Sequence, residues 1–303
     1  MELPTPLEKA PETLLPGRSV YWKREDAHEL GAFKWRGALP TIEKFRQDGA
    51  AAVVTASTGN HGAAVAWACR WAGLRAMVYA PAGASIAKLA LIDRFGAELR
   101  VTGTDLDFAK EEAKRFAAEA HLPFFEDGVE PTQFVGYGAI ADEILDQLPE
   151  HPAAVIVPVG NGALICGIGQ TLHRRAPETL VVGVVAKEAP VMALSFEAHA
   201  PVECDRMDTF ADGMAVRVAI PAAVELVNEV VDRMLMVSER EIAVAVGEFA
   251  KAGLRVEGAA AASLAALAKL EEVEGPVVLV VTGRNIDDAL YHRAVEQPET
   301  FPE

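Results

Sequence analysis

Residues 51–81 read AAVVTASTGNHGAAVAWACRWAGLRAMVYAP and change periodicity twice. The apolar run AAVVTA predicts a strand, the alanine-rich segment GAAVAWACRWAG predicts a helix, and RAMVYAP predicts a second strand. Both strands are apolar throughout instead of alternating with polar residues, which is typical of parallel sheet buried on both faces. This stretch therefore predicts an α/β fold.

The same alternation continues along the chain, with segments of helical period between most of the apolar runs. Residues 198–217 depart from it, and we expect a loop-rich excursion there. The charge run from Lys23 to Asp26 is interpreted as a solvated face. Further strands are expected at residues 98–103, 153–160, 180–186 and 276–283, and further helices at residues 85–96, 104–121, 136–149 and 256–275.

Composition narrows the class of protein. A chain of 303 residues with 51% apolar residues suits two domains or one large one. It contains no apolar run of the roughly 18 residues that a membrane span needs, and its N-terminus has Pro and Glu where a signal peptide would be basic and apolar. We therefore expect a cytoplasmic protein that does not bind a membrane. The net charge of -16 also disfavours nucleic acid as a partner.

Cysteine usage points to neither a disulfide framework nor a zinc site. Cys69, Cys166 and Cys204 are odd in number and widely spaced, and they form no CxxC pair. We interpret all three as reduced packing residues.

Lys34 is the first candidate for chemistry. It lies in GAFKWRGA between Phe33 and Trp35. A lysine held against aromatic side chains loses hydration, which makes its amine more available as a nucleophile. With the STGNHG loop one predicted strand later, this arrangement suggests a Schiff-base enzyme.

Three loops follow predicted strands, at the edge where open α/β sheets bind ligands. Ser57 to Gly62 open a helix with hydroxyl and amide side chains, which suits a carboxylate or phosphate. Gly160 to Ala163, in VPVGNGALICG, would let an anion approach the backbone closely. Thr282 to Asn285 end the last predicted strand. Taken singly, each loop is explained by an ordinary structural role: a Ser or Thr cap with a turn glycine for the first, a strand-to-helix turn for the second and a turn at a strand end for the third.

The order of six motifs is more informative than any one of them. KREDAHELGAFKWRGA, ASTGNHG, PVGNGALICG, FADGMAV, VEGAAAA and VVTGRNID together resemble the serine/threonine dehydratase and serine racemase family of fold type II pyridoxal phosphate enzymes. The resemblance extends from about Thr5 to about Asp287. It implies a two-domain, open parallel-sheet architecture. Residues 1–51 and 130–303 would form a large cofactor-binding domain and residues 52–129 a small inserted one, with the active site in the cleft between them.

The resemblance also implies roles for single residues. Lys34 would be the Schiff-base lysine and the base that removes the α-proton. Thr282 would face the pyridine nitrogen, where a hydroxyl donates to an unprotonated ring and weakens the electron sink. A weaker sink favours expulsion of a β-substituent. The other implied cofactor contacts are Phe33 and Gly213 on the two ring faces, Asn60 at the phenolic oxygen, and Gly160, Asn161, Gly162, Ala163 and Leu164 at the phosphate.

The implied reaction is β-elimination. A hydroxy amino acid such as L-threonine or L-serine would yield a 2-keto acid and ammonia. Ser57, Asn60 and His61 would hold the substrate carboxylate. Three alternatives stay open: an amino-acid racemase, a threonine synthase-like β-replacement enzyme of the same fold, and a protein that binds pyridoxal phosphate without turnover.

Several residues near the expected substrate and cofactor positions need separate interpretation, and some of them depart from the family pattern. Thr58 stands where racemases carry a catalytic serine, and Tyr137 stands in a Gly-Tyr-Gly-Ala segment that the family usually writes Gly-Gln-Gly-Thr. Glu257 matches a family acid near the cofactor, although a carboxylate favoured by the helix dipole explains it equally well. Arg284 replaces a small residue beside the pyridine contact. It would either reach the ring nitrogen or point to solvent, and we expect the latter.

The resemblance also bears on metal, assembly and regulation. Val185 and Val191 fall where metal-activated members have carboxylates, so we expect no metal at that site. A homodimer or higher homo-oligomer is expected. The sequence ends soon after the last motif, so feedback control by isoleucine is not expected.

Overall fold

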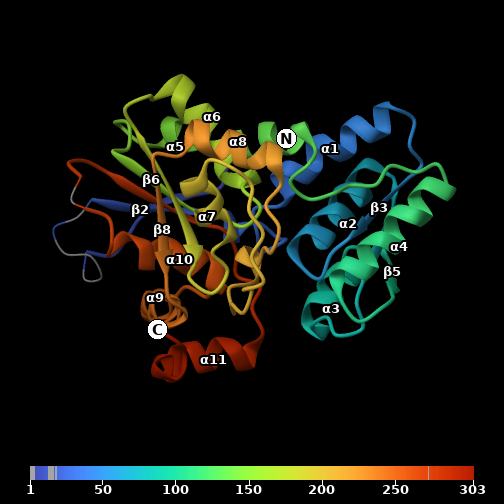
Figure 1. The fold of residues 1–303 in the computed structure, drawn as a ribbon. Helices are drawn as coiled ribbons and strands as arrows, with labels where there is room; N and C mark the ends of the chain where they lie inside the picture. Colours follow the sequence, from blue (N-terminus) through green and yellow to red (C-terminus); the bar gives the residue numbers. More distant parts are fainter. Residues whose placement is uncertain (1–3, 13–16, 18, 272) are drawn as a thin grey trace. The chain divides into compact units, whose positions relative to one another are not determined.

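Two sheets, each covered by helices, organise the protein; one is wholly parallel and the other is parallel except for its edge strand β1 (Figure 1). The structure is a computed structural model and describes residues 4–12, 17, 19–271 and 273–303. The chain forms two units: unit 1 comprises Met1–Gly31 and Tyr137–Glu303, and unit 2 comprises Ala32–Gly136. The α/β class with parallel sheet, predicted from the apolar runs, is confirmed.

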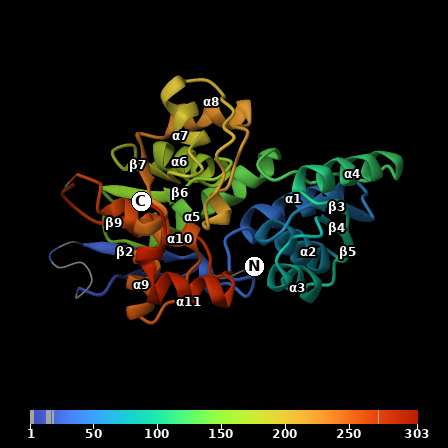
Figure 2. The same ribbon diagram turned by 60° about the horizontal axis from the view of Figure 1, so that its bottom comes forward.

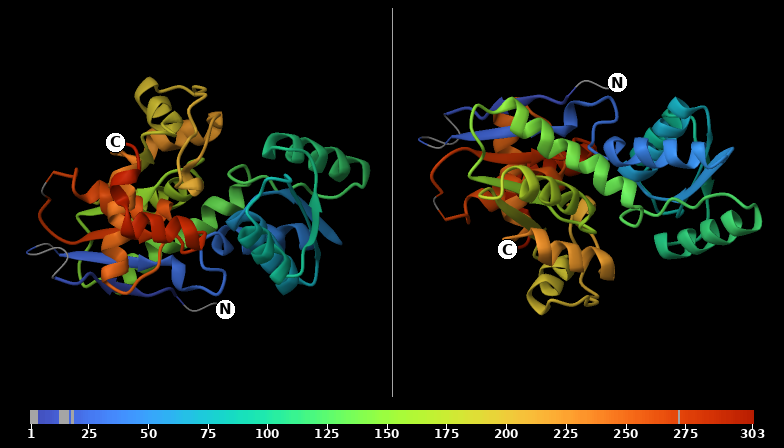
Figure 3. Two further views of the ribbon diagram at one scale, coloured as in Figure 1. Left: turned by 90° about the horizontal axis from the view of Figure 1, so that it is seen from below. Right: turned by 90° about the horizontal axis from the view of Figure 1, so that it is seen from above.

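Unit 1 contains, within the described residues, a six-stranded sheet in the order β1-β2-β9-β6-β7-β8. Strand β1 is antiparallel to β2, and all other neighbours are parallel. Figure 3 shows β9, near the red end of the colour scale, beside the blue N-terminal strand. The strands are β1 (Leu7–Lys9), β2 (Val20–Arg24), β6 (Ala154–Pro158), β7 (Leu180–Ala186), β8 (Arg233–Val237) and β9 (Val277–Val281).

Helices cover both faces of this sheet. Ile156 and Val184 pack with the alanines of one helix, α10, whereas the intervening strand residues face the other way, as the two-residue period of a strand requires. Figure 2 shows α11 beside α9, which in turn packs on α10. The helices are α5 (Pro131–Gln147), which begins in unit 2, α6 (Ala163–Arg175), α7 (Val191–Ala198), α8 (Pro221–Val230), α9 (Glu239–Lys251), α10 (Gly258–Leu267) and α11 (Asp288–Glu296), with 3₁₀ turns η1 (Glu25–Ala27), η2 (Asp212–Met214) and η3 (Pro298–Thr300).

Unit 2 contains a parallel sheet in the order β3-β4-β5. Alanines of α4 pack on one face against Val54 and Met77, while α2 lies on the other face (Figure 1). Its strands are β3 (Ala52–Ala56), β4 (Arg75–Ala80) and β5 (Glu98–Val101), and its helices are α1 (Trp35–Gln47), α2 (Asn60–Ala72), α3 (Ile86–Arg94) and α4 (Leu106–Glu119).

The unit boundaries differ from those that the resemblance implied. Helix α1 belongs to unit 2, because Trp35 packs edge-on against Trp67 of α2 and Phe45 packs against Phe125. The change of unit therefore falls at Gly31/Ala32 and Gly136/Tyr137.

Two local expectations need correction. The charge run that begins at Lys23 is not a solvated face: Lys23 and Glu25 are fully buried, because the Lys23 ammonium pairs with Glu143 at 2.6 Å and donates to the Thr5 carbonyl. The helix expected over residues 256–275 ends at Leu267, and residue 272 lies outside the described residues. The excursion after residue 198 is confirmed, since only the turn η2 interrupts it before residue 217.

Among the described residues, no helix combines the length and the apolarity that crossing a bilayer requires.

Candidate active site

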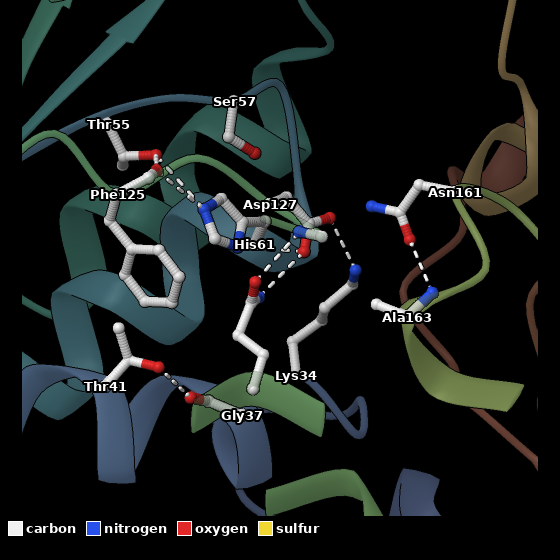
Figure 4. Close-up of polar contacts among 12 residues, drawn as sticks. Lys34, Gly37, Thr41, Thr55, Ser57, His61, Phe125, Asp127, Asn161 and Ala163 are labelled. Atoms are coloured by element: carbon white, nitrogen blue, oxygen red, sulfur yellow. Dashed lines mark hydrogen bonds and ion pairs between the residues drawn. The ribbon is translucent and has the colours of Figure 1, made fainter. Parts of the chain in front are cut away.

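Lys34 is positioned by the start of helix α1. It occupies the N-cap position, and its carbonyl accepts the first helical hydrogen bond from Ala38. The ammonium lies 5.0 Å from the centroid of the Phe33 ring, as the sequence suggested. It also forms an ion pair of 2.6 Å with Asp127, which the sequence analysis did not single out. Lys34 is therefore packed on an aromatic ring and also paired with a carboxylate. Figure 4 shows the pair of Lys34 with Asp127.

Asp127 reaches Lys34 because the preceding segment runs alongside β3. The Val54 amide donates to Pro123 and the Val54 carbonyl accepts from Phe125, which forms a short parallel bridge. Residues just beyond this bridge emerge at the carboxyl end of β3, where Ser57 also lies. The apolar run PFF that precedes Asp127 is too short to predict a strand. The periodicity of the sequence therefore gave little indication that Asp127 would lie beside Lys34.

His61 lies on the other side of Asp127. Its Nδ1 is 3.5 Å from Asp127 Oδ1, and its Nε2 is 3.1 Å from the Thr55 hydroxyl. The ring packs edge-on against Phe125 with a centroid separation of 4.9 Å. Burial lowers the pKa of His61, and the neighbouring Asp127 only partly opposes this. His61 is therefore a buried, neutral imidazole with polar partners at both nitrogens.

The loop after β3 combines a local turn with accessible positions. The Ser57 hydroxyl accepts a hydrogen bond of 3.1 Å from the Gly59 amide, which closes a turn within the loop; Gly59 is the N-cap residue of α2, and no side chain caps this helix. Thr58 and Asn60 are half-buried. Asn60 is the first residue of α2, so amides of the first helical turn point toward the same loop.

In unit 1 the glycine loop Gly160 to Leu164 joins β6 to α6. Gly162 is the N-cap residue with a φ of 91°, a conformation that favours glycine. The Ala163 amide donates a hydrogen bond of 3.1 Å to the Asn161 side-chain oxygen (Figure 4). One of the amides expected to bind phosphate is therefore bonded to a side chain of its own loop in this structure.

Three further motif residues of unit 1 lie around that loop. A Cβ on Gly160 would be 2.5 Å from the Gly213 carbonyl, so these two backbones touch. Glu257 is buried and donates its amide to the Gly283 carbonyl at 3.0 Å, beside Thr282. Strands β6 and β9 are parallel neighbours, which explains why the loops that follow them meet.

Thr282 has an unusual environment. Its hydroxyl is buried, and within the described residues it has no hydrogen-bond partner. A buried hydroxyl without a partner costs about 1–3 kcal/mol, so it marks a place for an acceptor from outside the chain. A pyridine nitrogen is such an acceptor, and the residues present therefore fit pyridoxal phosphate.

Arg284 and Tyr137 were also candidate site residues, and the structure places both in structural contacts. The Arg284 guanidinium donates to the Asp26 carbonyl, so it neither points to solvent, as we expected, nor reaches toward Thr282. The neighbouring Asn285 side chain donates to the Leu30 carbonyl at 2.9 Å, and together they fasten the segment that ends at Gly31. Tyr137 is fully buried in α5.

Glycine loops at the carboxyl ends of parallel strands, a lysine at a helix start and a buried hydroxyl without a partner define an α/β enzyme that binds a phosphorylated, ring-containing cofactor. Residues 1–283 match the model of the pyridoxal-phosphate dependent enzyme family. The chain belongs to this family.

Named relatives agree with this assignment. The chain is 34% identical to an L-threonine ammonia-lyase of Geobacter sulfurreducens over 275 residues, which cover 89% of this chain and 68% of that protein. It is also 34% identical to an L-threonine ammonia-lyase of Thermotoga maritima, over 93% of this chain and 71% of that protein. Among solved structures, processed threonine deaminase isoform 2 of Solanum lycopersicum superposes with a TM-score of 0.90 at 29% identity, covering 97% of this chain and 88% of that one.

Proposed function

We propose that the protein is a pyridoxal-phosphate-dependent ammonia-lyase that converts L-threonine or L-serine to a 2-keto acid and ammonia. The observation that carries the proposal is the buried Thr282 hydroxyl without a partner. A hydroxyl at the pyridine nitrogen leaves that nitrogen unprotonated and favours departure of a β-substituent. The two threonine ammonia-lyases at 34% identity support the same reaction.

The family resemblance assigns tasks to residues of both units. In unit 2, Lys34 would bind the cofactor and take the α-proton, while Ser57 and Asn60 would orient the substrate carboxylate. In unit 1, the loop that begins at Gly160 would hold the phosphate and Thr282 would donate to the ring. When bound, pyridoxal phosphate supplies the electron sink for the pair released from the broken Cα–H bond.

The overall reaction balances without a further reagent. The Cα–H bond breaks, the β-hydroxyl leaves with a proton as water, and one water then replaces the amino group, which leaves as ammonia. Neither an oxidant nor a reductant is needed.

Product analysis tests the proposal. Purified protein loaded with pyridoxal phosphate is incubated with L-serine, L-threonine and their D forms, and keto acid, ammonia and enantiomer ratio are measured. We expect keto acid and ammonia in equal amounts from an L-substrate, and none from Lys34→Ala. D-Serine formed from L-serine without keto acid would overturn the proposal in favour of a racemase.

Location and assembly are proposed with the activity. We propose a cytoplasmic enzyme of amino-acid metabolism that forms a homodimer or a higher homo-oligomer. Sedimentation equilibrium measures the assembly state directly, and a monomer at all concentrations would contradict it.

A further inference from the structure

The ion pair between Lys34 and Asp127 involves the atom that would do the chemistry. Lys34 Nζ lies 2.6 Å from Asp127 Oδ2, and the two side chains keep 16% and 27% of their surface exposed (Figure 4). Both residues belong to unit 2. The pair is partly sheltered from water, so the attraction is screened less than that of a surface pair.

Asp127 is itself held in place. Gln133 Nε2 donates to Asp127 Oδ1 at 3.0 Å, and Gln133 Oε1 accepts from the Gly128 amide at 2.8 Å. Gln133 is fully buried in the first turn of α5. The carboxylate is therefore held by its surroundings, whereas the long Lys34 side chain can rotate about the bonds of its methylene chain. Lys34 is thus the partner that can change position.

His61 does not compete with Lys34 for this carboxylate. The Thr55 hydroxyl donates to the Phe125 carbonyl at 2.7 Å, so it accepts from His61 Nε2–H. This leaves His61 Nδ1 without a proton in the neutral ring, and a neutral Nδ1 cannot donate to Asp127. The pKa of His61 is lowered by burial, which keeps the ring neutral. The charge of Asp127 is thus available to Lys34.

Lys34 stabilises the charged form of Asp127. Burial alone would raise the pKa of Asp127, but the charge of Lys34 and the hydrogen bonds from Lys34 and Gln133 outweigh it and hold that pKa below its usual range. Asp127 therefore stays a carboxylate, which is the state that pairs with Lys34.

We propose that Asp127 is a positioning residue that receives the Lys34 amine whenever it is free of the cofactor and holds it in the observed ion pair. This inference rests on the proposed function. The α-proton would pass to Nζ as the Cα–H bond breaks and an N–H bond forms, while the electron pair would be shared by the substrate and the bound cofactor. Asp127 would then accept a hydrogen bond from the new ammonium and keep it in place.

The substitution Asp127→Asn should raise the labelling rate of Lys34 and lower the turnover rate, and these opposite effects distinguish a positioning role from a structural one. In Asp127→Asn the ion pair that holds the cofactor-free amine is lost, so an amine-directed reagent at pH 7 should label Lys34 about tenfold faster, as followed by peptide mass spectrometry. In turnover the same variant should lose about tenfold or more in kcat, with a smaller change in KM and a shifted pH profile of kcat. A folding defect would lower turnover without this selective gain at Lys34.

Glu126→Gln is the matched control. Glu126 precedes Asp127 and pairs with Lys110 and Lys114 of α4 instead, so the same charge change should alter neither rate. The inference is overturned if Lys34 labelling in Asp127→Asn is unchanged or slower while the thermal midpoint stays that of the wild type. If Lys34 is labelled faster in Asp127→Asn but the wild-type protein has no lyase activity, the pairing of Lys34 with Asp127 stands and the proposed function does not.

Discussion

The Cβ position of Gly160 lies 2.5 Å from the carbonyl oxygen of Gly213. Two loops that are distant in sequence thus meet backbone to backbone, and no side chain fits between them. The family resemblance implies that Gly160 contacts the cofactor phosphate and Gly213 a face of its ring.

Gly160→Ala should disturb this contact. A methyl group at 2.5 Å from a carbonyl forces the two loops apart, and we expect a loss of about 1–3 kcal/mol in stability with at least tenfold weaker binding of pyridoxal phosphate. Denaturant unfolding and fluorescence titration measure the two effects. Gly83→Ala is the control, since nothing lies within 4 Å of its Cβ, and it should change neither. Unaltered cofactor affinity in Gly160→Ala would separate this loop from the cofactor.

Thr282→Val should affect the cofactor-free and the loaded protein in opposite directions. Without cofactor, a methyl replaces a buried hydroxyl that lacks a partner, so stability should stay the same or rise by about 1 kcal/mol. With cofactor, the donor to the ring is lost and affinity should fall. Thr41→Val is the contrast: its hydroxyl donates to Gly37 at 2.9 Å, so the cofactor-free protein should lose about 1 kcal/mol. A destabilised cofactor-free Thr282→Val would show that its hydroxyl has a partner.

Asn161→Gly should strengthen phosphate binding. The Asn161 side chain bonds the Ala163 amide, and removing it leaves that amide for the ligand. We expect pyridoxal phosphate to bind several-fold more tightly by calorimetry. Asn228→Ala, on α8, should have no effect, because its amide bonds Val224. Weaker binding in Asn161→Gly would mean that the side chain contacts the ligand.

Acid should destabilise the protein through His61. Its folded pKa is lowered, so between that value and the unfolded value of about 6.5 the unfolded state binds more protons and stability falls as pH falls. His61→Gln should reduce this dependence, as measured by urea unfolding between pH 5 and pH 8, whereas the exposed His151→Gln should leave it unchanged. Equal slopes for wild type and His61→Gln would contradict a neutral buried ring.

The sequence predicted best those strands that contain no charged residue. Val277 to Val281 are buried on both faces, so their apolar run reveals them directly. Strand β2 was not expected, because it contains Lys23 and Arg24. Its burial depends on Glu143, which lies far along the chain, and no local pattern reports such a partner.

The residues of the candidate site likewise fall into those that local sequence suggests and those that only tertiary contacts reveal. Lys34 and Thr282 are suggested by their local motifs, whereas Asp127 becomes visible only when the chain beside β3 brings it to Lys34. Arg284 illustrates the converse: its place near a motif suggested a role in the site, but its donors serve the backbone of residues 26–28. Local chemistry identifies reactive residues, and tertiary contacts decide which groups surround them.

The pairing of β2 with β9 has a consequence for synthesis on the ribosome. Residues 20–24 emerge early, yet the strand that separates them from β6 consists of residues 277–281. Unit 2 is continuous in sequence and can fold as soon as it has emerged, whereas the sheet of unit 1 stays open until nearly the whole chain is made. Nascent chains should therefore expose an apolar strand edge for most of translation, which makes them candidates for chaperone binding.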